Sequence, residues 1–200
     1  MIALVDYGAG NVKSVARALR AVGGEVHLTA DPQQIIDAER VVFPGQGHFG
    51  QAMQRLEQSG LSDAIRQAVA GGRPFLGICL GLQLLFEGSD EAPGARGLGL
   101  LPGRCVRFGE PLKVPQIGWN EVSTSGDDPV LSVIDGGYMY FVHSYFAPAS
   151  DHGHVAATSD YGGPFAAAVR RDNVLATQFH PEKSGRLGLA LLRRWLESSC

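Results

Sequence analysis

One stretch near the middle of the chain limits the fold more than any other. Residues 74–86 read Pro-Phe-Leu-Gly-Ile-Cys-Leu-Gly-Leu-Gln-Leu-Leu-Phe. The apolar residues before Cys79 are typical of a buried strand, and the apolar segment after it is compatible with a helix. Gly77 and Gly81 allow the sharp turn that exposes a nucleophile at the end of a sheet, and a helix N-terminus behind the sulfur would favour the thiolate. Taken alone, these residues fit a buried structural cysteine equally well, since cysteine is among the most buried residue types.

Apolar strands and helices alternate on the N-terminal side of this stretch. Residues 2–5 and 41–43 form short, continuous apolar runs, and residues 26–29 read as a further short strand. Helical spacing follows each run, with Asn11 and Asp31 placed to begin the first two helices and further helices expected over about 49–58 and 61–69. Continuous rather than alternating apolar strands predict a parallel sheet that is covered on both faces.

The C-terminal half changes character. Strand-like runs occur at residues 98–108, 119–122, 138–145, 155–158, 165–169 and 174–179. Residues 170–173 read as a hairpin turn, and an amphipathic helix ends the chain. We therefore predict a single α/β domain over residues 1–200, with a central, mostly parallel sheet flanked by helices and antiparallel strands in its C-terminal half.

Composition and charge narrow the possible partners. The chain is 44% hydrophobic and 18% charged, with a formal net charge of -3, which gives no electrostatic reason to expect nucleic acid or an anionic membrane. No apolar run is long enough to span a membrane. The three cysteines form neither a disulfide framework nor a zinc pattern, so we expect a cytoplasmic protein with Cys105 in the core and Cys200 at a frayed terminus.

Two short patterns suggest ligands only weakly. Gly8 and Gly10 resemble part of a dinucleotide fingerprint, but the third glycine is missing. His152 and His154 have the spacing of a metal ligand pair without a third ligand nearby. We expect neither a metal nor a cofactor.

A base for Cys79, and an acid to orient that base, occur together near the C-terminus. His180 and Glu182 are two residues apart, so on an extended segment both side chains would point the same way. Glu182 would then hold the imidazole in the tautomer that accepts a proton from the thiol. Cys79 and His180 can meet only if their strands end at the same edge of the sheet.

Acyl transfer at Cys79 also requires donors for an oxyanion. The N–H of Leu80, directly after the cysteine, is one candidate. A second would come from residues 44–47 (Pro-Gly-Gln-Gly), where the glycines allow the N–H of Gly47 to turn inward.

Together these motifs resemble the class I (triad) glutamine amidotransferases. The shared motifs are Pro-Gly-x-Gly after an early strand, Gly-Ile-Cys-Leu-Gly-x-Gln at residues 77–83 and His-Pro-Glu at 180–182. Asp-Tyr-Gly-x-Gly-Asn at 6–11, Val-Pro-x-x-Gly-Trp-Asn at 114–120 and Phe-Val-His-Ser-Tyr at 141–145 narrow the resemblance to the glutaminase subunits of imidazole glycerol phosphate synthases. The resemblance covers nearly the whole chain and implies the flavodoxin-like fold of that family.

The resemblance implies a reaction and assigns residues to it. Cys79 would form a glutamyl thioester with glutamine, His180 would protonate the departing ammonia and then activate water, and Glu182 would orient His180. The positions that match the family's glutamine-binding residues are Gln83, Glu91, Ser144 and Tyr145.

A partner is implied as well. Ammonia would pass to a (β/α)8-barrel cyclase in a heterodimer, which makes imidazole glycerol phosphate and aminoimidazole carboxamide ribotide in histidine biosynthesis. Asn11, Pro115 and Trp119 are the candidate contacts with this cyclase. An N-cap, a loop proline and a half-buried tryptophan explain them equally well.

Two other functions stay open at this point. Another triad amidotransferase, serving pyridoxal phosphate, anthranilate or guanylate synthesis, would share the triad, but residues 6–8 and 118–120 argue against it. A non-catalytic binding or redox-sensing α/β domain would lack the orienting acid that Glu182 supplies. An α/β-hydrolase is disfavoured because its acid precedes the histidine in the chain.

Overall fold

A nine-stranded sheet forms the centre of the computed structural model, which describes residues 1–9, 11–149 and 153–198. Its strand order is β2-β1-β3-β4-β12-β11-β10-β7-β8. The strands are β1 (Ile2–Val5), β2 (Val26–Thr29), β3 (Arg40–Gly45), β4 (Phe75–Cys79), β7 (Gln116–Thr124), β8 (Gly137–His143), β10 (Val155–Asp160), β11 (Pro164–Arg171) and β12 (Val174–Thr177). A small second sheet joins β5 (Gly88–Ser89), β6 (Arg104–Arg107) and β9 (Tyr145–Phe146).

The sheet changes from parallel to antiparallel along its width. The five strands from β2 to β12 in this order are parallel, and β11, β10, β7 and β8 continue it in antiparallel pairs. The hairpin predicted at 170–173 is present between β11 and β12, with Asp172 at φ 51° in the turn. The predicted fold class is therefore confirmed, including the antiparallel C-terminal half.

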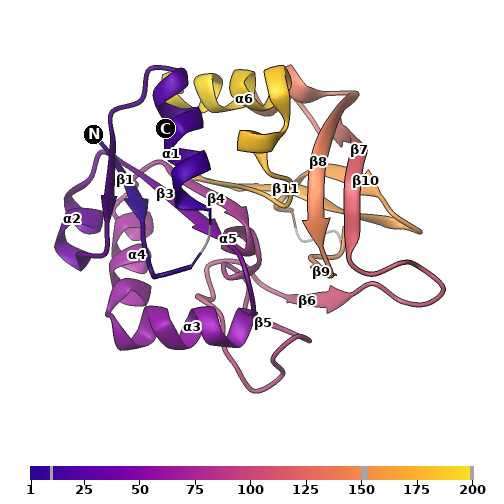
Figure 1. The fold of residues 1–200 in the computed structure, drawn as a ribbon, viewed down its shortest axis with the longest axis horizontal. Coiled ribbons are helices and arrows are strands. Elements are labelled where there is room, and N and C mark those ends of the chain that lie inside the picture. Colours follow the sequence, from indigo (N-terminus) through magenta and orange to yellow (C-terminus); the bar gives the residue numbers. More distant parts are fainter. Residues whose placement is uncertain (10, 150–152, 199–200) are drawn as a thin grey trace.

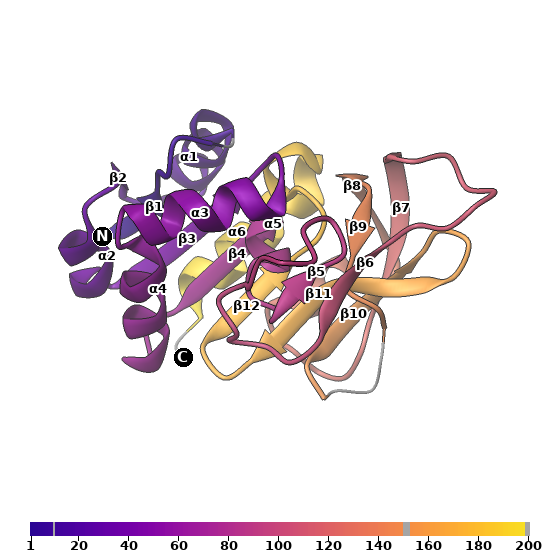
Figure 2. The same cartoon turned by 90° about the horizontal axis from the view of Figure 1, so that it is seen from below.

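Helices cover both faces of the parallel part (Figures 1 and 2). On one face lie α1 (Val12–Ala21) and α6 (Gly185–Glu197), and on the other lie α2 (Pro32–Asp37), α3 (Phe49–Gln58) and α4 (Leu61–Ala70). Asn11 and Asp31 cap α1 and α2 by accepting from the N–H groups of Ser14 and Gln33, as their positions predict. Each helix turns an apolar stripe to the sheet, so two separate cores form, one on each face.

Two predicted elements are wrong in extent. Residues 98–108 contain only the four-residue β6, because Gly99 and Gly103 adopt positive φ and the segment instead bonds to the backbone of residues 84–86. The helix after Cys79, α5 (Leu80–Gln83), is a single turn. The residues that follow, 84–86, are buried and have no polar face to leave in solvent, so the chain folds into the core instead of continuing a surface helix.

Three neighbouring parallel strands end at one edge of the sheet. In the register of β3 and β4, Gly45 lies opposite Cys79, and in the register of β12 and β4, Thr177 lies opposite Ile78. The segments that leave these strands carry residues 46–47, Leu80 and His180. The carboxyl edge therefore gathers the predicted chemistry at one place, as open α/β sheets do.

Three residues named from sequence patterns, Gly10, His152 and Cys200, lie outside the described residues. His154 is buried and contacts the ring of Phe86 edge-on. Within the described ranges, no helix has the length and apolar character needed to cross a membrane.

Candidate active site

Cys79 occupies a strained turn between β4 and α5. Its φ is 55° and its ψ is -109°, a conformation that a side-chain-bearing residue rarely adopts. The two flanking glycines are required by packing: a Cβ on Gly81 would lie 2.0 Å from the carbonyl oxygen of Phe43, and a Cβ on Gly77 would lie 2.9 Å from the Cβ of Ala176. The turn can therefore form only because the chain lacks side chains on both sides of the cysteine.

His180 and Glu182 form a buried pair. The Nδ1 of His180 lies 2.8 Å from Glu182 Oε1, and the two side chains are 3% and 1% exposed. The predicted contact is present, but its predicted basis is wrong. Glu182 lies in the 3-10 helix η2 (Pro181–Lys183), so a tight turn rather than an extended segment brings the carboxylate to the imidazole.

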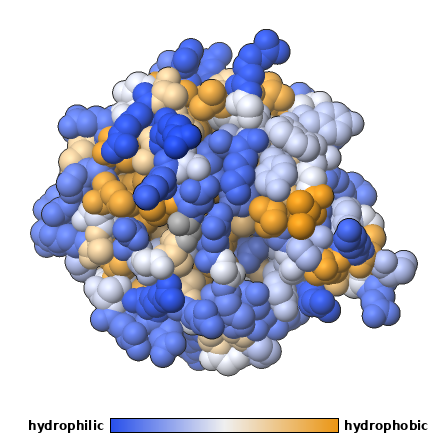
Figure 3. Space-filling model, viewed as in Figure 1, coloured by the Kyte–Doolittle hydropathy of each residue, from blue (hydrophilic) through white to orange (hydrophobic). Residues whose placement is uncertain are grey.

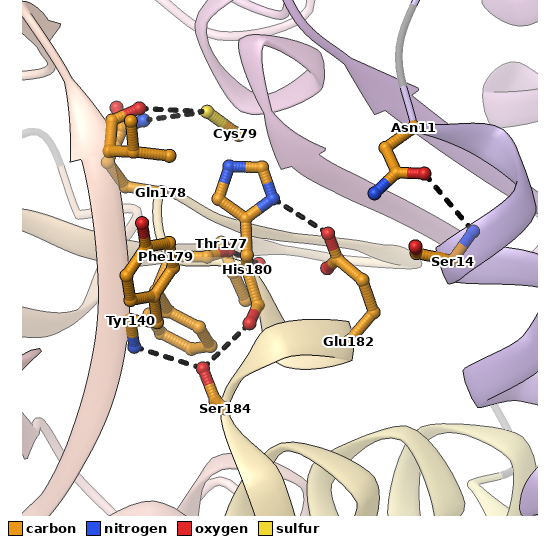
Figure 4. A network of polar contacts seen from close by, with 11 residues as sticks. Asn11, Ser14, Cys79, Tyr140, Thr177, Gln178, Phe179, His180, Glu182 and Ser184 are labelled. Carbon is orange, nitrogen blue, oxygen red and sulfur yellow. Dashed lines mark hydrogen bonds and ion pairs between the residues drawn. The ribbon is translucent and has the colours of Figure 1, made fainter. Parts of the chain in front are cut away.

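The backbone of His180 is fixed by neighbouring strands and turns (Figure 4). Its N–H donates to the carbonyl of Tyr140 at 2.9 Å, and its carbonyl accepts from Ser184 Oγ at 2.7 Å. The same hydroxyl oxygen accepts from the N–H of Tyr140 at 3.0 Å. Because Nδ1 donates to a carboxylate, Nε2 is the free nitrogen, and Figure 4 shows it on the side of the ring that faces Cys79.

The electrostatics of the site favour a protonated His180. Burial by itself would lower the pKa of His180, but the negative charge of Cys79 and the contact with Glu182 outweigh it and raise the pKa to about 10. An imidazolium at neutral pH can donate a proton to a leaving group. The arrangement therefore suits a thiolate nucleophile with a histidine acid beside it.

A pocket of about 420 Å³ opens over Cys79 and His180. Its volume lies in the range of small-molecule sites, roughly 300–1,000 Å³. The residues that line it are Gln46, Gly47, Cys79, Leu80, Gln83, Glu91, Pro115, Tyr140, Val142, His143, Ser144, Tyr145, His180 and Lys183. Acidic and basic side chains therefore line the same pocket as the buried sulfur of Cys79.

Comparison with known proteins decides the family. The family model described as "Glutamine amidotransferase class-I" matches residues 3–197. A relative from Geobacter metallireducens, "Imidazole glycerol phosphate synthase subunit HisH", is 48% identical, with 97% of this chain and 96% of the relative aligned. The chain belongs to the HisH family of class I glutamine amidotransferases. It is therefore a glutamine amidotransferase of histidine biosynthesis.

Two further similarities are informative. A relative from Arabidopsis thaliana, "Imidazole glycerol phosphate synthase hisHF, chloroplastic", is 45% identical, and the alignment covers 98% of this chain but 34% of the relative. A crystal structure of a glutamine amidotransferase superposes with a TM-score of 0.76 at 21% identity, covering 98% of each chain. The structural match shows that this HisH-family chain has the class I amidotransferase fold.

The predicted oxyanion donors both border the pocket. Leu80 is the first residue of α5, and Gly47 follows β3 with a φ of 98°. A Cβ on Gly47 would meet no atom within 4 Å, so the backbone conformation, not lack of space, is what calls for glycine here.

The four predicted glutamine-binding residues line the same pocket but are engaged differently. Glu91 Oε2 accepts from the N–H of Phe49 at 2.7 Å, at the start of α3. Gln83 donates both of its amide hydrogens within the protein, one to the carbonyl of Tyr145 at 2.7 Å. Ser144 lies at the break between β8 and β9, where the sequence predicted one continuous strand.

The predicted partner contacts lie in different local settings. Pro115 borders the pocket, and Trp119 on β7 is 52% exposed with its ring packed edge-on against Tyr140 at 5.9 Å. Asn11 caps α1 and, with Glu182, lines a small cavity that shares Gln46 and His180 with the main pocket. Figure 3 shows an orange patch of hydrophobic residues over the lower part of β8.

Sequence reasoning missed two buried polar residues beside the site. Gln178 follows β12 and contacts the sulfur of Cys79, and His143 at the end of β8 lines the pocket. Burial lowers the pKa of His143 to about 4, so this imidazole is neutral and its Nδ1 donates to the carbonyl of Tyr145. A polar residue at the end of an otherwise apolar strand was the available signal for both.

Cys105 is part of the core, as predicted. It is fully buried, and burial raises the pKa of its thiol, which keeps it protonated and unreactive.

Proposed function

We propose that residues 1–200 act as one cytoplasmic glutaminase domain that hydrolyses glutamine to glutamate and ammonia through a thioester on Cys79. The observation that carries the proposal is the buried pair of His180 and Glu182, which lies at the same edge of the sheet as Cys79 at the end of β4, beside a pocket. The assignment to the HisH family agrees with it.

In the first half-reaction the thiolate of Cys79 attacks the side-chain carbonyl carbon of glutamine. The N–H groups of Leu80 and Gly47 stabilise the oxyanion of the tetrahedral intermediate. The imidazolium of His180 gives its Nε2 proton to the amide nitrogen, which leaves as ammonia, and a glutamyl thioester remains. Glu182 stabilises the imidazolium before the transfer and fixes the ring afterwards.

In the second half-reaction neutral His180 takes a proton from water, and the resulting hydroxide attacks the thioester carbon. Collapse of the second tetrahedral intermediate breaks the carbon–sulfur bond and releases glutamate. The thiolate of Cys79 and the imidazolium of His180 are thereby restored together. No metal or cofactor enters either step.

Glutamine would be held by groups at the far side of the pocket. One oxygen of Glu91 is bonded to the backbone, which fixes the carboxylate and leaves the other oxygen for the α-ammonium group. Ser144 and Tyr145 would contact the α-carboxylate end, and the free carbonyl oxygen of the Gln83 side chain would accept from the substrate.

We further propose that the chain works in a heterodimer with a (β/α)8-barrel cyclase that receives the ammonia. Two relatives support a two-part synthase: one is named as a subunit, and the hisHF relative is about three times the length of the aligned region. The exposed hydrophobic side chains on β7 and β8 also support it. Ile117, Trp119 and Tyr138 are 62%, 52% and 56% exposed, on two paired strands of which β7 directly follows the pocket-lining Pro115.

Glutamate release from glutamine, with and without the cyclase and its nucleotide ligand, tests the proposal. We expect strong stimulation by the cyclase and its ligand together. Glutaminase activity that ignores the cyclase would keep the triad but refute the partner. In the complex, Cys79→Ala should abolish glutamine-dependent synthesis and leave synthesis from ammonium salts intact; loss of both activities would make Cys79 structural.

A further inference from the structure

The sulfur of Cys79 has a polar neighbour besides His180. The amide nitrogen of Gln178, Nε2, lies 3.7 Å from the sulfur, within hydrogen-bonding distance for sulfur, and Figure 4 shows this contact. Gln178 is fully buried immediately after β12, two residues before His180. Its backbone N–H donates to the carbonyl of Ala167 on β11, so the sheet fixes the backbone from which this side chain extends.

The hydrogen bonds around Gln178 fix which end of its amide faces the sulfur. Gln83 Nε2 donates to the carbonyl of Tyr145 at 2.7 Å and to Gln178 Oε1 at 3.0 Å. A backbone carbonyl can only accept, so the side-chain nitrogen of Gln83 must point toward both partners. Gln178 must then accept with its oxygen, and its nitrogen is left to donate to Cys79.

Gln83 thus donates to Gln178 and Gln178 donates to Cys79, while the carbonyl of Tyr145 fixes the orientation of Gln83 by accepting its other hydrogen. Gln83 is 4% exposed and Gln178 is fully buried, so water does not compete for their amides. A hydrogen bond to a charged acceptor is roughly twice as strong as one between neutral groups, and the low dielectric of the interior strengthens it further. A donor held here therefore favours the thiolate over the thiol.

We propose that Gln178 is a catalytic residue whose amide N–H stabilises the thiolate of Cys79, and that Gln83 holds that amide in its donating orientation. The inference rests on the proposed function of Cys79 as nucleophile. The bond is strongest in the two states where sulfur carries charge: before attack on glutamine, and as the thioester breaks. In the thioester the sulfur is neutral and the bond weakens, so Gln178 assists both the formation of the nucleophile and its departure.

These hydrogen bonds also give Gln83 a different role from the other residues that line the pocket. Both of its N–H groups are used inside the protein, so it has no donor left for the carboxylate of glutamine. Gln83 is therefore primarily a positioning residue for Gln178, with only its carbonyl oxygen facing other partners.

The first test is the pH dependence of Cys79 alkylation by iodoacetamide in the full chain, with the kinetics of the cyclase complex alongside. Gln178→Met keeps the side-chain volume and removes the donor. We expect the acid limb of the alkylation profile to move up by about one pH unit, and alkylation on that limb to slow about tenfold. In the complex we expect kcat to fall about tenfold with KM nearly unchanged, since Gln178 does not line the pocket.

A second variant guards against simple misfolding. Gln178→Glu keeps the shape and the acceptor for Gln83 but replaces the donor by a carboxylate that repels the thiolate, so alkylation at pH 8 should slow more than in Gln178→Met. Gln116→Met is the matched control: Gln116 is also a buried glutamine, it donates to Asn120 on β7, and it lies outside the pocket. We expect its alkylation profile to match the wild type.

The inference is overturned by the following result: both Gln178 variants fold and support ammonia-dependent synthesis in the complex, yet their alkylation profiles match the wild type and their kcat values lie within twofold of it. A lowered melting temperature with an unchanged profile would also overturn it, because Gln178 would then be structural. Failure of the proposed function looks different: the wild-type complex would release no glutamate.

Discussion

Replacing Glu182 by glutamine is the sharpest test of the proposed triad of Cys79, His180 and Glu182. The side chain keeps its shape, but its amide would donate to Nδ1 of His180 and force the proton onto Nε2, so the ring could not accept from Cys79. The lost bond is short, at 2.8 Å, and buried, with side chains 3% and 1% exposed. A hydrogen bond to a charged group contributes about 1.5–3 kcal/mol, and reversal of the tautomer adds to that loss. We expect kcat to fall by a factor between roughly 10² and 10⁴.

The assay is glutamate release by the cyclase complex at saturating glutamine, with ammonia-dependent synthesis measured on the same samples. The second activity should be unchanged, because it bypasses Cys79. Glu57→Gln, on the exposed face of α3, controls for the loss of one negative charge and should match the wild type.

The loss should be greatest near neutral pH. In the wild type the pKa of His180 is raised to about 10, with Glu182 among the causes, so the imidazolium persists across the physiological range. Without the carboxylate the cation is less favoured there. A Glu182→Gln variant that retained more than a tenth of the wild-type kcat at pH 7 would refute an orienting role for this residue.

Three further results are expected. Burial lowers the pKa of His143 to about 4 from 6.5, so the folded state resists protonation of this imidazole. The free energy of unfolding should therefore fall by about 3 kcal/mol as pH drops from 6.5 to 4, and His143→Asn should reduce this pH dependence in urea titrations. Trp119→Ala should weaken binding of the cyclase by roughly tenfold or more in titration calorimetry without lowering the melting temperature, since the ring is 52% exposed; unchanged affinity would remove Trp119 from the interface. Gly81→Ala should cost about 3 kcal/mol or more in chemical denaturation because its Cβ would lie 2.0 Å from a backbone oxygen, whereas Gly94→Ala, with no atom within 4 Å, should be near neutral; equal effects would contradict the packing argument.

Local patterns predicted most of the framework. The strand at 26–29 and the helices at 49–58 and 61–70 occur where they were predicted, within a residue, and Asn11 and Asp31 cap helices as expected. These features depend on residues a few positions apart, so they can be read from a short window. Gly77 and Gly81 predicted the sharp turn at Cys79 for the same reason, since they lie two residues from it.

Features that depend on tertiary contacts were predicted poorly. The one-turn α5 and the four-residue β6 are short because residues 84–86 and 98–101 bond to each other rather than extending their own elements. The contact of His180 with Glu182 was expected from an extended segment and arises from a 3-10 turn. Packing of the surrounding chain outweighed local preference in each case.

The sequence by itself determined the groups on which the proposed chemistry depends: a glycine-flanked Cys79, a histidine with an acid two residues on, and a loop able to present N–H groups. Only the tertiary structure decided that these groups meet, because 101 positions separate Cys79 from His180 and their proximity depends on β3, β4 and β12 lying side by side. It also decided the orientation of Gln178 toward the sulfur. That orientation depends on the carbonyl of Tyr145 on β9, the side-chain amide of Gln83 on α5 and the side-chain amide of Gln178 after β12. These groups are far apart in the sequence, so no local pattern specifies how they pack.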